Sequence, residues 1–264
     1  MTGGFEWIDS PDGHRLRLCM PAELERIVDA QILCRGSLLD GTRGAPSLIR
    51  PRIAHLLADD LLVSPWQVHG TAVHQSRPLW ALPNRVKADG VFIDSDHSRG
   101  TVASLRYGDC TPVLIASSLP RPWVLGLHSG FLGTLQNIVG SGIERISRHF
   151  GYAEPGAMHA WIGPAIGSCC YTRRRSDPTS ATALTLFGAP FCREEGEYLR
   201  IDLPGIVCEQ LVRTGIPRTN IRKLDRCTCC RRDYFYSYRG GDPEDRMVLL
   251  AKVIGRMPQN HAKQ

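Results

Sequence analysis

Hydrophobic positions along the chain fall into short blocks separated by turn-forming residues. Apolar runs that are rich in Val, Ile and Leu and bounded by Gly, Pro or Ser are typical of buried β-strands. The centre of the chain contains three such runs, at Thr101–Tyr107, Pro112–Ala116 and Trp123–Leu127. Two more lie on either side, at Val91–Ile93 and Met158–Ile162. This pattern predicts a β-sheet at the core of the fold.

Other segments carry apolar residues at the three- and four-residue spacing of an amphipathic helix. Two of them have a good helix start, with Asp202 as an N-cap and Pro243 in a first turn. The predicted helices are Pro21–Cys34, Pro51–Leu62, Thr134–Phe150, Asp202–Gly215 and Asp242–Met257.

The aromatic segment Tyr234–Arg239 alternates in the manner of a strand and ends on a cation. Together these elements mix short buried strands with helices and show no regular βαβ order. The sequence therefore predicts an α+β fold, a single domain over residues 1–264 with a mixed β-sheet core covered by helices.

Composition narrows the class of protein. The chain is 42% hydrophobic and carries a formal net charge of +6. No apolar run is long enough to span a membrane, and Met1–Trp7 lacks the features of a signal peptide. The basic clusters Arg173–Arg175 and Arg222–Arg232 are typical of solvated loops. We expect a cytoplasmic globular protein that binds neither nucleic acid nor membranes.

The chain has ten cysteines, and we expect reduced thiols because no secretory signal precedes them. Cys227 and Cys230 form one C-x-x-C pair, but no second such pair follows. Cys169 and Cys170 lie far upstream and lack that spacing. The pattern therefore does not predict a second, structural zinc site.

A first metal site is a better candidate. Cys110 lies in a turn between two predicted strands, His128 ends the third strand, and His69 precedes all three. One Cys and two His match a catalytic zinc site, which leaves its fourth position to water or substrate. Such wide spacing is also compatible with packed residues, and His74 and His97 are rival ligands.

Several short motifs follow one another in a specific order between Gln67 and Arg246. They are Gln67–Gly70 (QVHG), Lys87–Val91 (KADGV), Gly108–Val113 (GDCTPV), His128–Gly133 (HSGFLG), Gly163–Gly167 (GPAIG) and Cys227-Thr228 with Ser237-Tyr238-Arg239. This set resembles the laccase-domain (YfiH-like) family, first called multicopper polyphenol oxidoreductases and now regarded as zinc-dependent purine nucleoside phosphorylases with adenosine deaminase activity. The resemblance implies a sandwich of sheets covered by helices.

The resemblance also implies that zinc is bound by His69, Cys110 and His128, and that a purine nucleoside and phosphate are the substrates. Leu132 stands where the family usually has Arg or Lys, so phosphate must be held by another cation. Arg239 is our first candidate, ahead of Arg106 and Arg246, and Gln67 is the second residue assigned to substrate binding.

Catalytic roles fall to Asp109 and Cys110, with Asp109 managing protons or supporting the zinc site. Water would attack purine C6 in a deamination, and phosphate would attack the sugar C1′ in a phosphorolysis. A nucleophilic Cys110 paired with His128 would instead make a hydrolase for amide-containing cell-wall precursors, a role also proposed within the family. A degenerate metal-binding module without activity is a further alternative. Multicopper oxidation ranks last, because nine His without a His-x-His pair do not supply its ligands.

Overall fold

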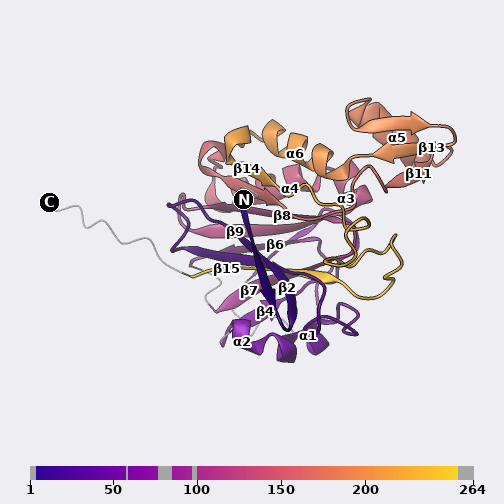
Figure 1. The fold of residues 1–264 in the computed structure, drawn as a ribbon. Coiled ribbons are helices and arrows are strands. Elements are labelled where there is room, and N and C mark those ends of the chain that lie inside the picture. The colour runs from indigo at the N-terminus through magenta and orange to yellow at the C-terminus, as the bar shows by residue number, and fades with distance from the viewer. Residues whose placement is uncertain (1–3, 58, 77–84, 97–99, 255–264) are drawn as a thin grey trace.

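Two six-stranded sheets lie face to face and form the body of the protein (Figure 1). The structure, a computed structural model, describes residues 4–57, 59–76, 85–96 and 100–254. Both sheets are mixed, because β4, β5 and β14 each pair parallel to a neighbour while the other pairs are antiparallel. The predicted α+β sandwich is confirmed.

The first sheet joins the N-terminal hairpin to the last described strand. Its strands, in spatial order, are β1 (Phe5–Ser10), β2 (Gly13–Leu18), β3 (Val28–Leu33), β15 (Met247–Val253), β7 (Thr101–Tyr107) and β4 (Leu61–Val63). The second sheet contains most of the predicted central strands. Its order is β14 (Ile221–Lys223), β10 (His159–Ile162), β8 (Thr111–Ser117), β9 (Trp123–Ser129), β6 (Gly90–Asp94) and β5 (Val73–Gln75).

A small third sheet projects from the body beside α5 (Figure 1). Its order is β11 (Thr172–Arg174), β13 (Tyr198–Ile201) and β12 (Cys192–Glu195). The helices of the described chain are α1 (Pro46–Arg52), α2 (Ala54–Leu57), α3 (Phe131–Leu135), α4 (Ile138–Phe150), α5 (Pro178–Phe187) and α6 (Leu203–Arg213).

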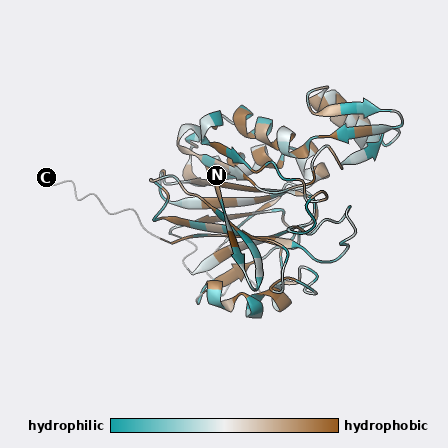
Figure 2. Ribbon diagram, viewed as in Figure 1, coloured by the Kyte–Doolittle hydropathy of each residue, from teal (hydrophilic) through white to brown (hydrophobic). Residues whose placement is uncertain are grey.

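The second sheet is buried on both faces, which explains its nearly unbroken apolar strands. On β8, Leu114 belongs to the apolar core shared with the first sheet, whereas Val113 and Ile115 belong to the core shared with helices α4 and α6. Those helices cover the outer face of this sheet (Figure 1). In Figure 2 hydrophobic segments occur both in the strands of the sandwich and in the helices beside them. Polar side chains of the central strands can therefore reach solvent only at the strand ends.

Two helix predictions are confirmed with small changes. Asp202 caps α6, because its carboxylate accepts a hydrogen bond from Gly205 N. The helix predicted over Thr134–Phe150 is present as α4, which begins only at Ile138, after the short helix α3. Asn137, with a left-handed φ of 59°, separates the two helices and caps α4.

Two helix predictions are wrong because the segments form central strands of the first sheet. Within Pro21–Cys34 the chain makes one turn and then enters β3, where Val28 and Ile32 are buried. These two residues lie four apart, a spacing that fits one face of a strand as well as a helix. The segment predicted as the helix Asp242–Met257 contains β15, and its residues 255–257 lie outside the described part. Pairing on both edges, with β3 and β7, overrides the local helical pattern of β15.

Two further predictions need correction. The helix expected over Pro51–Leu62 is replaced by α1, which starts earlier at Pro46, by the short helix α2 at Ala54–Leu57, and by β4 at its end. The expected strand Tyr234–Arg239 is a series of turns, because its side chains bind loops rather than a neighbouring strand. Tyr236, for example, donates its hydroxyl to Asp40 at 2.6 Å.

No helix in the described ranges has the length and apolar character needed to cross a lipid bilayer.

We predict that Leu249→Ala, in the centre of β15, lowers the free energy of unfolding by about 2–5 kcal/mol. Leu249 is 1% exposed and faces the second sheet near Gly126. Chemical denaturation measures the change, and Ile254→Ala, at a residue 52% exposed, is the control. Equal effects of the two substitutions would contradict the central position of β15.

Candidate metal centre and substrate pocket

The structure brings His69, Cys110 and His128 together from three separate segments. One side-chain ligand atom from each residue lies within 4.8 Å of the others. Cys110 lies in the turn between β7 and β8, His128 is near the end of β9, and His69 is in a loop held to the 87–90 segment. One thiol and two imidazoles thus meet at the edge of the sandwich.

Asp89 organises this cluster, although it carries none of the three ligand groups. Its fully buried carboxylate accepts the backbone N–H groups of Val68, His69 and Gly70 at 3.1, 2.9 and 2.8 Å. It also accepts the Nδ1–H of His128 at 2.8 Å. The three backbone hydrogen bonds hold His69 at a left-handed φ of 61°. Asp89 therefore sets the position of two of the three clustered side chains.

The hydrogen bond to Asp89 also fixes the form of the His128 ring. Burial lowers the pKa of His128, which favours the neutral ring. With Nδ1–H donated to Asp89, the lone pair of Nε2 is available to a cation. Burial disfavours the charged Asp89, yet hydrogen bonds from His128 and from the backbone amides of Gly70 and Val68 outweigh it and lower its pKa.

Cys110 has a different electrostatic environment. Burial, reinforced by the negative charge of Asp109, raises the pKa of the Cys110 thiol to about 12. A thiolate at this position needs a positive charge beside it, which a bound metal ion would provide.

Gly130 leaves room for the cluster. A Cβ atom at this position would lie 2.9 Å from His69 Cδ2 and 3.1 Å from Cys110 Sγ. The backbone at the start of α3 can therefore approach two of the clustered side chains only because residue 130 is glycine.

The cluster opens into a cavity of about 710 Å³. The cavity is lined by four aromatic and five arginine side chains together with the cluster. These aromatic and cationic residues are Trp66, Phe131, Tyr171, Tyr238, Arg43, Arg85, Arg106, Arg239 and Arg246. Trp66 and Tyr238 are 57% and 58% exposed, which is unusual for large aromatic side chains. The pocket thus offers flat apolar surfaces and a positive charge excess beside a candidate metal centre.

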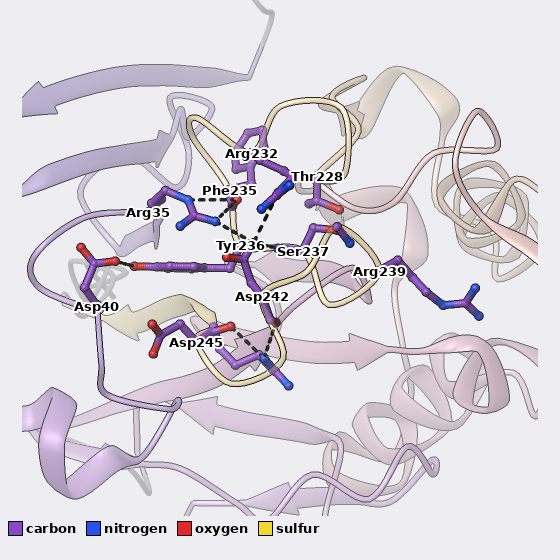
Figure 3. Close-up of polar contacts among 12 residues, drawn as sticks. Arg35, Asp40, Thr228, Arg232, Phe235, Tyr236, Ser237, Arg239, Asp242 and Asp245 are labelled. Carbon is purple, nitrogen blue, oxygen red and sulfur yellow. Dashed lines mark hydrogen bonds and ion pairs between the residues drawn. The ribbon is translucent and has the colours of Figure 1, made fainter.

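Arg239, the residue expected to hold phosphate, lies in this pocket. Its guanidinium lies 5.4 Å from the Tyr171 ring centroid and donates to the Thr172 carbonyl at 3.3 Å. Asp242, an alternative carboxylate partner on the same loop, instead binds Arg35 at 2.6 Å. Figure 3 shows the Arg239 side chain pointing away from that ion pair. Within the described ranges, no ion pair to a carboxylate is found for Arg239, and the residue lines the cavity.

Asp109 binds the loop that carries Arg239. This residue is 6% exposed and has a left-handed φ of 83°. Its Oδ1 accepts the hydroxyls of Thr228 and Ser237, both at 2.6 Å, and its Oδ2 accepts Arg239 N–H at 2.7 Å. The geometry therefore favours a positioning role for Asp109.

Gln67 also lines the pocket, but its amide is engaged with backbone groups. It donates from Nε2 to the Arg106 carbonyl at 2.8 Å and accepts Arg106 N–H through Oε1 at 2.9 Å. This pair of bonds attaches the His69 loop to β7. The substrate-binding role of Gln67 remains a prediction.

The other two predicted cations are partly engaged. Arg106 donates to Ser64 Oγ at 2.5 Å and to the Pro65 carbonyl at 2.6 Å, and burial lowers its pKa to about 10. Arg246 donates to the carbonyls of Asp245 and Pro243. Both contribute charge to the pocket from fixed positions.

The structure describes one of the two rival ligands. His74 lies on β5 and is not part of the His69 group, and His97 lies outside the described residues. Leu132, which replaces the usual cation, is 43% exposed on α3. Sequence reasoning missed the roles of Asp89 and Thr228, although both stand in motifs that carried the resemblance. It also missed Trp66 and Tyr171, which have no distinguishing spacing.

Comparison with known proteins identifies the family of the chain. The family model described as multi-copper polyphenol oxidoreductase laccase matches residues 50–257. The purine nucleoside phosphorylase YlmD of Geobacillus stearothermophilus is 30% identical over 154 residues, 57% of this chain and 54% of that protein. A purine nucleoside phosphorylase of Haemophilus influenzae is 29% identical over 192 residues, 70% of this chain and 71% of its own length.

The fold is also shared with a solved structure. The crystal structure of the hypothetical protein YfiH of Bacillus licheniformis superposes with a TM-score of 0.77 at 24% identity, covering 94% of this chain and 98% of that one. The chain therefore belongs to the multi-copper polyphenol oxidoreductase laccase family, whose YfiH-like members were indicated by the sequence motifs.

Proposed function

We propose that the chain is a zinc-dependent purine nucleoside phosphorylase. The observation that supports this most directly is the position of His69, Cys110 and His128 at a cavity with aromatic and arginine walls. A purine requires flat apolar contacts, and a phosphate requires cations with hydrogen-bond donors. The names of the two similar proteins support the same activity.

The three clustered residues fit a zinc ion. Their donor set of two imidazole nitrogens and one sulfur is one that zinc accepts, with a fourth position open to another ligand. The hydrogen bond from His128 to Asp89 is the usual outer support of a metal-binding histidine. A zinc ion held here would act as a Lewis acid close to the reacting atoms.

The protein's own residues then have separate tasks in phosphorolysis. Arg239 holds the phosphate, with Arg106 and Arg246 adding positive charge. Trp66 and Tyr238 provide walls for the purine. A phosphate oxygen forms a bond to the sugar C1′ as the bond from C1′ to the purine nitrogen breaks. The departing base takes that electron pair and the proton that the attacking hydrogen phosphate gives up, so atoms and charge balance.

The central test is product analysis with the purified, metal-loaded protein and adenosine. We expect adenine and ribose 1-phosphate only when phosphate is present. Inosine formed with or without phosphate would show adenosine deaminase activity at the same site. Absence of all three products from protein with full metal content would refute the proposal and favour an amide hydrolase or a non-enzymatic metal-binding module.

We predict that the double substitution of His69 and His128 by alanine removes about one zinc per chain relative to the unchanged protein. Metal analysis by mass spectrometry gives the stoichiometry, and His74→Ala is the control that should retain the wild-type content. Unchanged zinc in the double variant would rule out this ligand set, and copper in the unchanged protein would rule out zinc.

Arg239→Ala should raise the KM for phosphate by about 10- to 100-fold, the equivalent of one lost charge-assisted pair of hydrogen bonds. The KM for the nucleoside should change far less. Arg231→Ala is the matched control, because Arg231 pairs with Asp233 on the same loop and does not line the cavity. Loss of thermal stability with unchanged phosphate kinetics would assign Arg239 to loop structure alone.

Asp109→Asn should leave the metal content unchanged. It should raise the KM for phosphate, as Arg239→Ala does. An amide that retains the Thr228 and Ser237 hydrogen bonds at its oxygen would turn an N–H donor toward the Arg239 N–H, so the loop must shift. A positioning role predicts that this effect largely disappears in an Arg239→Ala background. Fully additive effects would show that Asp109 acts independently of Arg239.

A further inference from the structure

Four cysteines that are far apart in the sequence meet at a second place in the fold. Cys169 and Cys170 approach Cys227 and Cys230, and all four Sγ atoms lie within 4.8 Å of one another. Cys230 Sγ lies 3.4 Å from Cys170 Sγ and 3.6 Å from Cys169 Sγ. The sequence spacing did not predict this group, because the packing of two loops brings the four cysteines together and no repeated C-x-x-C motif marks them.

These distances suit a metal ion better than disulfide bonds. Zinc bonds to sulfur at about 2.3 Å, which places the corners of a tetrahedral site about 3.8 Å apart. A disulfide requires about 2.05 Å between the two sulfurs. The separations between Cys230 and the vicinal pair are close to the tetrahedral edge.

The two loops that carry the cysteines are held together by their backbones. Ala165 and Cys227 form an isolated parallel bridge, and Thr228 N–H donates to the Ala165 carbonyl at 3.0 Å. The N–H of Gly167 donates to Cys227 Sγ at 3.3 Å. Such a bond to sulfur stabilises a thiolate ligand from outside the metal site.

Gly167 also provides the space that the group requires. A Cβ atom at this position would lie 3.2 Å from Cys169 Sγ and 3.4 Å from Cys227 Cβ. The second glycine of the GPAIG motif therefore permits close contact between the two cysteine loops.

We propose that Cys169, Cys170, Cys227 and Cys230 bind a structural Zn²⁺ ion that is separate from the His69 centre. Four thiolates complete a tetrahedral site and leave no position for substrate, which distinguishes it from a catalytic site. Each cysteine gives up its proton on binding, so the site contributes folding free energy instead of chemistry.

The proposed zinc site would stabilise two loops that contribute to the substrate pocket or hold one of its residues. Cys170 is followed by Tyr171, which lines the substrate cavity, and Cys227 is followed by Thr228, which binds Asp109. A metal ion that joins these two loops would fix both the aromatic wall and the anchor of the loop that carries Arg239.

The test uses the full chain with His69 and His128 replaced by alanine, so that the first centre does not contribute metal. After reconstitution with zinc under reducing conditions and removal of free metal, we expect about one zinc per chain. Adding Cys227→Ser and Cys230→Ser should remove it. Cys229→Ser in the same background is the matched control, because Cys229 belongs to the same loop but not to the group of four.

Cobalt provides a second measurement that does not depend on the cysteine variants folding. The His69/His128 variant loaded with Co²⁺ should show intense thiolate-to-metal charge-transfer absorption of a four-sulfur tetrahedral site. Less than about 0.2 zinc per chain together with no such absorption would overturn the proposal. So would disulfide bonds among the four cysteines in protein kept under reducing conditions.

Discussion

The buried carboxylate of Asp89 is the interaction on which the candidate centre depends. It lies next to the start of β6, is fully buried, and accepts three consecutive backbone N–H groups from the His69 loop as well as Nδ1–H of His128. A charge buried this deeply is tolerated only when it is fully hydrogen-bonded. The same bonds that satisfy Asp89 give His69 its left-handed backbone and His128 its tautomer. Removal of this carboxylate would release both histidines at once.

Burial of the second sheet on both faces explains why the chemistry is found at strand ends. Side chains within β8 and β9 are enclosed by apolar cores on either side, so polar groups gather where the strands leave the sheet. Asp109 has the same relation to the loop of Arg239 that Asp89 has to the loop of His69. Each carboxylate accepts backbone N–H from a separate segment, three such groups at Asp89 and one at Asp109. A residue with a left-handed φ lies at each place, Asp109 itself and His69. Backbone strain of this kind persists where the surrounding bonds determine it.

The sequence predicted the central strands well because their apolar runs leave no alternative to burial. It predicted β3 and β15 wrongly, since helical spacing at Val28 and Ile32 also fits one strand face and partner strands are not visible in the local pattern. Residue type and strand-end position made His69, Cys110 and His128 candidates for a zinc site. Only the resemblance distinguished them from packed residues and rival ligands, because they are too far apart to form a motif. The role of Asp89 was not predicted, since nothing in its neighbours shows that its carboxylate faces inward. The four-cysteine group was not predictable, as the contact between two loops brings its members together.

The place of β15 has a consequence for synthesis of the chain. This strand, the last one described, lies between β3 and β7 and is the link that joins the N-terminal hairpin to the rest of the first sheet. Both neighbours leave the ribosome long before it, so each carries an unpaired edge during that interval. Open edges of apolar strands are templates for pairing with other chains. The nascent protein thus spends most of its synthesis with an incomplete sheet, and we expect its yield to depend on how well those two edges are protected until β15 arrives.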